Sequence, residues 1–126
     1  MTFGEAVNTC LKQKYATFQG RAARSEYWWF TLFSILAQIG AQIVFAVLAS
    51  MGEAAALLGI VILAVVVLGL ILPGISVLVR RLHDTDRSGW WFWIALVPLV
   101  GSIILLVFLV TKGTEGENTF GADPLA

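Results

Sequence analysis

The segment Arg80–Trp91 holds the most varied chemistry in this chain. It places three arginines, two aspartates and the only histidine between two long apolar runs. His83 beside Asp84 has the ingredients of a metal site, and a histidine by itself can act as a pH switch. One histidine with nearby carboxylates supplies too few ligands for a transition metal within one chain. Asp84 and Asp86 also resemble the start of a calcium loop, but Ala95 occupies the twelfth position, where a glutamate is required. We therefore expect no metal.

The rest of the chain offers little catalytic chemistry. It has no glycine-rich phosphate loop, no nucleophile placed beside a base, and no carboxylate pair at catalytic spacing. Cys10 is the single cysteine, so no internal disulfide can form, and it is interpreted as an apolar residue on a helix face. We assign no catalytic residue and no cofactor, and we do not expect an enzyme.

The elements that position Arg80–Trp91 are apolar and long. The chain has 126 residues, of which 59% are hydrophobic and 13% charged, against about 25% charged in soluble domains. Three uncharged apolar runs cover residues 27–50, 54–79 and 90–110, and each reaches the roughly 20 residues that cross a bilayer. The fold class predicted is all-α integral membrane, a single domain with three transmembrane helices. Pro98 lies inside the third run, where it removes a backbone donor.

Basic residues orient these runs. Lysine and arginine number four before the first run, none in the first loop, three in the second loop and one in the tail. The positive-inside rule then predicts a cytoplasmic N-terminus and second loop, and a polar tail, residues 111–126, on the periplasmic side. Tryptophans at the starts of the first and third runs are expected to form an anchoring belt at the inner interface. The basic patch is explained by the membrane, and no nucleic-acid partner is expected.

The N-terminal segment, residues 1–25, is expected to lie at the cytoplasmic interface. Residues 3–18 carry apolar side chains at helical spacing along one face. This pattern predicts an amphipathic helix lying in the interface, with a soluble partner-binding helix as the competing interpretation.

Four stretches of the chain resemble one known family. Residues 18–28 resemble the opening motif of a bacterial inner-membrane family known as domain-of-unknown-function family 805. Residues 80–91 resemble the family's central signature. Residues 98–101 resemble its motif in the last span, and residues 113–124 its tail motif. The resemblance implies a small multi-pass protein of the bacterial inner membrane without established activity. It supplies no catalytic residues.

Two groups of polar residues are candidate sites. The first is an inner-face cluster, in which we expect Glu26 to pair with Arg80, Arg81 or Arg24, and the two aspartates to lie near Arg87 and Arg21. Its members are Arg21, Arg24, Glu26, Arg80, Arg81, His83, Asp84, Asp86 and Arg87. In the same loop, Ser88 or Asp86 is expected to cap the third helix. The second group is an intramembrane polar stripe along the first run, made of Thr31, Ser34, Gln38 and Gln42.

These groups leave three functions open. The leading one is a structural or partner-binding membrane component, with the lipid bilayer and a homo-oligomer or another membrane protein as partners. In that case the cluster locks the helix ends, and the stripe forms hydrogen bonds between helices. The second is an oligomeric transporter or channel for a small polar solute or ion that uses the stripe. The third is a membrane enzyme centred on His83 and Asp84.

Overall fold

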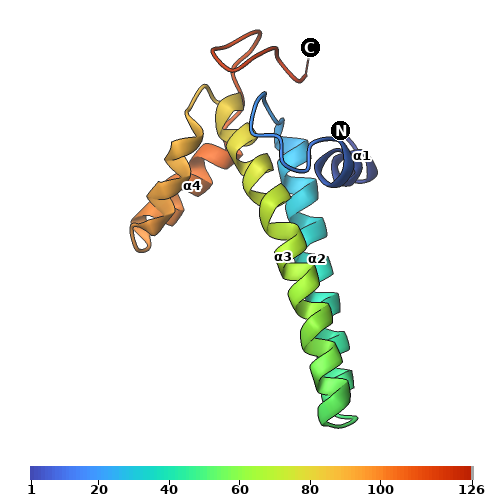
Figure 1. The fold of residues 1–126 in the computed structure, drawn as a ribbon. Helices are drawn as coiled ribbons and strands as arrows, with labels where there is room; N and C mark the ends of the chain where they lie inside the picture. Colours follow the sequence, from blue (N-terminus) through green and yellow to red (C-terminus); the bar gives the residue numbers. More distant parts are fainter. Residues whose placement is uncertain (126) are drawn as a thin grey trace.

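The computed structural model describes residues 1–125 and is helical, with no strand in that range. Ala126, the last residue of the expected tail, lies outside the described residues. Figure 1 shows two long helices side by side, with the N-terminal segment, a splayed helical hairpin and the C-terminal tail gathered towards one end of them. The all-helical prediction is therefore confirmed for the described residues.

Helices α2 (Arg24–Ala49) and α3 (Glu53–Asp84) form the antiparallel pair, and both are long and apolar enough to cross a membrane. At 1.5 Å per residue they measure about 39 and 48 Å. Gly52 in the turn between them has a φ of 125°, which a residue with a side chain rarely adopts. Within the pair, a Cβ at Gly59 would lie 3.1 Å from the Phe45 Cα, so a glycine is needed for this close approach.

Helix α3 extends beyond the apolar run that we expected to end at residue 79. It continues without interruption through Pro73 and on to Asp84. The basic residues Arg80 and Arg81 therefore lie on a helix that is already held by α2, and they point from its last two turns into the surrounding segments.

The third apolar run differs from its prediction. In place of one helix over residues 90–110, the structure has a 3₁₀ helix, η2 (Gly89–Leu96), and a short helix, α4 (Val100–Val110). Pro98 has no N–H to continue a helix and drives Val97 into extended backbone, with a ψ of 116°. Leu99 then adopts a φ of 62°, and the Val100 N–H donates to the Pro98 carbonyl at 2.7 Å, which reverses the chain in a γ-turn. Each arm of this hairpin is only about 16 Å long.

The N-terminal segment also departs from expectation. Helix α1 (Phe3–Asn8) and a π-helical turn, η1 (Thr9–Gln13), replace the single helix predicted over residues 3–18. Tertiary bonds hold the chain after Gln13 out of a helix: the Tyr15 hydroxyl donates to the Gly69 carbonyl at 2.7 Å, and the Ser76 hydroxyl donates to the Tyr15 carbonyl at 3.1 Å. The aromatic ring of Phe3 packs edge-on against that of Trp29 on α2.

Candidate functional site

The centre of the candidate site is the arginine cluster, which we define as Arg21, Glu26, Arg80, Arg81 and Asp84. All five are buried, although each carries a formal charge. Three segments supply them: the loop before α2, the first turn of α2 and the end of α3. The cluster therefore joins segments that are 63 residues apart in the chain.

Arg80 is fully enclosed, with 0% of its surface exposed. Its Nη1 donates to the Glu26 Oε2 at 2.7 Å, which selects one of the three partners left open for Glu26 by the sequence. Its Nη2 lies 3.9 Å from the Cys10 Sγ, and its Nε has no partner within the described residues. Burial and the charge of Glu26 raise the pKa of the Cys10 thiol to about 11, so this cysteine is a neutral part of the packing.

Asp84 bridges the other two arginines of the cluster. The Arg21 Nε donates to one carboxylate oxygen at 2.9 Å, and the Arg81 Nη1 donates to the other at 2.7 Å. Arg81 further donates to the carbonyls of Leu109 and Thr111 at the end of α4. Three arginines thus face two carboxylates. Main-chain carbonyl oxygens accept the further donors of Arg21 and Arg81, but not the Nε of Arg80.

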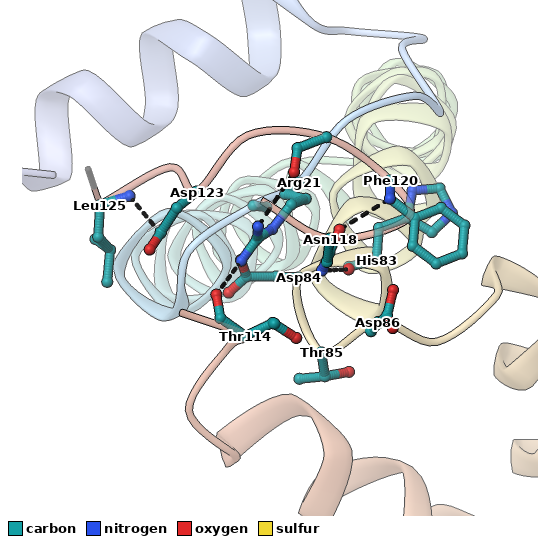
Figure 2. Close-up of polar contacts among 12 residues, drawn as sticks. Arg21, His83, Asp84, Thr85, Asp86, Thr114, Asn118, Phe120, Asp123 and Leu125 are labelled. Carbon is teal, nitrogen blue, oxygen red and sulfur yellow. Dashed lines mark hydrogen bonds and ion pairs between the residues drawn. The ribbon is translucent and has the colours of Figure 1, made fainter. Parts of the chain in front are cut away.

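The C-terminal tail supplies many of those carbonyls, as Figure 2 shows. Arg21 donates to the carbonyls of Thr114 and Gly116, the latter at 2.6 Å. The Thr114 N–H donates in return to the Asp84 carbonyl at 2.7 Å. The Asn118 side-chain amide donates to the carbonyl of His83 at 2.9 Å, so the tail is bound to both α3 and the loop before α2.

These contacts correct the predicted position of the tail. We expected residues 111–126 on the opposite side of the membrane from Arg80–Trp91, but residues 114–121 lie against the end of α3. The physical reason is the reversal at Pro98, which returns the chain to the end of the α2–α3 pair from which it came. Thr114, Asn118 and Phe120 consequently belong to the site, although they were not among the residues predicted for it. The tail motif over residues 113–124 was the available signal.

His83 has a defined place next to the tail. Its ring stacks on that of Phe120 with centroids 4.1 Å apart and planes 3° from parallel, and its Nδ1 lies 2.9 Å from the Gly20 carbonyl. Because a carbonyl only accepts hydrogen bonds, Nδ1 must carry the proton, which leaves Nε2 as an acceptor in the neutral ring. The residue therefore has a packing role that the sequence left unassigned.

The remaining cluster candidates lie at its edge. The Asp86 carboxylate accepts from the Thr119 N–H at 3.2 Å, and the Arg87 guanidinium lies 4.0 Å from the centre of the Phe108 ring. Arg24 is exposed and donates to the Val110 carbonyl at 3.4 Å. None of these three is in an ion pair within the described residues. Ser88 caps η2 by accepting from the Trp90 N–H, as expected for the start of this segment.

The polar stripe lies elsewhere, on a flank of α2. Thr31, Ser34 and Gln38 line a cavity of about 450 Å³ between α2 and α3, whereas Gln42 lies outside that cavity and is exposed. The Thr31 hydroxyl donates to the Tyr27 carbonyl of its own helix. Within residues 1–125, the side chains of Ser34, Gln38 and Gln42 have no hydrogen-bonding partner.

The cluster consists of buried ion pairs and hydrogen bonds that join the ends of the helices. The Asp84 carboxylate pairs with two guanidinium groups and that of Glu26 with one. The His83 ring stacks on Phe120 and is hydrogen-bonded to the Gly20 carbonyl. Among the described residues, no group of three or more histidine, cysteine, aspartate or glutamate side chains could hold a metal ion. The charged groups that looked reactive in the sequence are instead bound to one another and to the main chain.

Comparison with known proteins gives one family. The family model described as "Protein of unknown function (DUF805)" matches residues 15–122. The inner membrane protein YhaI of Escherichia coli (strain K12) is 42% identical over 112 residues, covering 89% of each chain. The inner membrane protein YhaH of the same strain is 39% identical over 117 residues, covering 89% of this chain and 90% of the relative. No solved structure matches this chain.

Proposed function

This chain belongs to the DUF805 family of inner membrane proteins, and from that premise we propose that it is a non-catalytic, partner-binding component of the bacterial inner membrane. The observation that carries the proposal is the arginine cluster. Its five charged side chains are buried and engaged with each other and with the tail, so they stabilise the fold and are not free for a substrate. The surface left for function is the apolar exterior of the helices.

We further propose that α2 and α3 span the bilayer and that the hairpin enters and leaves by the cytoplasmic leaflet. Each hairpin arm is about half of the roughly 30 Å that a span must cover. Its turn is strongly exposed, with 76% of the Leu99 surface accessible, which suits contact with lipid. Charge supports the same arrangement: all eight lysines and arginines then lie on the cytoplasmic side, and the loop at residues 50–52 has none.

A pair of C-terminal fusions tests this topology. A fluorescent protein fused after the tail should fluoresce, and alkaline phosphatase fused at the same point should be inactive, because both would be in the cytoplasm. Active phosphatase would refute the proposed path of the hairpin. A phosphatase fusion within the loop at residues 50–52 serves as the control and should be active.

Partner binding is tested by crosslinking in native membranes. A photoreactive residue introduced at lipid-facing positions of α2, α3 and the hairpin should give discrete protein adducts at some positions. Adducts with lipid only, at every position tried, would overturn the proposal.

The alternative of a membrane enzyme is tested at His83. Replacing His83 with alanine should leave the function of the protein intact when the variant folds normally, whereas loss of that function would favour the membrane enzyme.

The second candidate, an oligomeric transporter or channel, has one observation in its favour. Three residues of the polar stripe line the cavity between α2 and α3. Flux of a small polar solute or ion into liposomes containing the purified protein would support it, provided that Gln38→Leu/Gln42→Leu abolishes the flux. No flux above that of empty liposomes would exclude this role for the solutes tested.

A further inference from the structure

We propose that the polar stripe on α2 is the contact surface of a parallel homodimer, in which the glutamines of two copies bond to each other. This inference rests on the proposed partner-binding function and names the partner as a second copy of this chain. It starts from Gln38 and Gln42, whose amides have no hydrogen-bonding partner within residues 1–125.

The depth of these amides makes a partner necessary. Gln38 and Gln42 lie eleven and seven residues before the end of α2 at Ala49, or about 16 and 10 Å along the helix. Both amides are therefore within the hydrocarbon of the proposed span. An amide there has no water to bond and is stabilised by a bond to another polar group.

The flank that carries the stripe is only partly covered, and Gln42 on it is exposed. Successive residues on a helix are 100° apart, which places Phe33 and Trp29 on the flank of α2 opposite to Gln42. Helix α1 covers that opposite flank through Phe3, whose ring lies 5.8 Å from that of Trp29 and 6.3 Å from that of Phe33. The stripe flank instead borders the cavity between α2 and α3, where Gly74 has no side chain to fill the space.

Self-pairing fits this surface in both chemistry and symmetry. All copies insert in one orientation, so a two-fold axis along the membrane normal brings each residue opposite its own counterpart at the same depth. A glutamine side chain both donates and accepts, so it is complementary to another glutamine. A hydrophobic partner would leave these amides unsatisfied, and a charged partner at this depth is costly. A second copy satisfies them with groups that the chain already carries.

Cysteine crosslinking of the purified protein in proteoliposomes tests the dimer. Ile35 and Leu36 are adjacent and almost equally exposed, at 50% and 53%, but only Ile35 lies on the stripe flank and lines the cavity. In a Cys10→Ala background, Ile35→Cys should form a disulfide-linked dimer at least about fivefold faster than Leu36→Cys. Equal rates, or no dimer at either position, would overturn the proposal.

The glutamines are tested in the same Ile35→Cys background. Gln38→Leu/Gln42→Leu should weaken dimerisation by about 5- to 30-fold, as expected for loss of hydrogen bonds between helices. Unchanged dimerisation would show that the amides do not pair. The thermal unfolding of each variant in detergent identifies any that fail to fold, and Leu36→Ile is a control off the stripe flank. Adducts with another protein in native membranes, without any dimer in proteoliposomes, would refute self-pairing while leaving the partner-binding function standing.

Discussion

The ion pair between Glu26 and Arg80 gives the sharpest prediction about the fold. In Glu26→Ala, Arg80 keeps its buried charge, but its nearest remaining side-chain partner is the Cys10 sulfur at 3.9 Å. Removing one partner of a buried pair costs about 3–5 kcal/mol, because the other charge remains uncompensated. Small proteins have only about 5–15 kcal/mol of stability in total, so this is a large fraction.

The assay is reversible unfolding by SDS in mixed micelles, followed through the five tryptophans. Glu53→Ala is the matched control, since Glu53 is an exposed glutamate at the opposite end of α3 and should cost less than about 1 kcal/mol. The double variant Glu26→Leu/Arg80→Met removes both charges and should return to within about 1 kcal/mol of the unsubstituted protein.

Two results would refute this reasoning. If Glu26→Ala costs no more than Glu53→Ala, the pair does not hold the helix ends together. If the double variant is as unstable as the single one, the loss comes from packing and not from an uncompensated charge.

The remaining predictions concern the hairpin, the tail and the thiol. Gly101→Ala should destabilise the protein by more than about 2 kcal/mol in the SDS assay, because its Cβ would overlap the Ile94 carbonyl oxygen. Gly40→Ala, in open space, should cost nothing. Arg21→Ala should speed proteolysis of the tail in inverted vesicles by at least about tenfold, because the charged hydrogen bonds from Arg21 to the tail are lost. Arg24 is exposed, and Arg24→Ala should speed it by less than about threefold. Equal effects of the two substitutions would count against the tail contacts. Cys10 should react with iodoacetamide at pH 8 at least about tenfold slower in the folded than in the SDS-unfolded protein. Its rate should rise as the pH approaches the raised pKa of about 11, because the thiolate is the reactive form; equal rates in the two states would contradict burial of the thiol.

The sequence predicted much of the cluster because charges near lipid leave few choices. Glu26 and Arg80 lie beside apolar runs that bring their ends together, and a carboxylate there needs a cation. What the residue types left open was which of three arginines would be chosen. Packing of α2 on α3 decided which arginine pairs with Glu26, since it places the Arg80 Nη1 2.7 Å from the Glu26 Oε2.

The third run shows where sequence reasoning failed. Its length and apolarity meet the criterion of about 20 consecutive apolar residues for a transmembrane helix. That criterion does not consider the backbone conformations of Pro98 and the residues on either side of it. The structure has extended backbone at Val97 and a γ-turn at Leu99, which turn a kink into a full reversal. The error in the position of the tail follows from this single point.

The sequence by itself thus determined an all-helical protein of the membrane, a first loop without basic residues and the need for its buried charges to pair, because these follow from composition and from the cost of charge in lipid. Only the tertiary structure decided that the tail returns to the arginine cluster, that His83 stacks on Phe120, and that three residues of the polar stripe line a cavity between α2 and α3. These depend on contacts between segments far apart in the chain, which local sequence patterns do not specify.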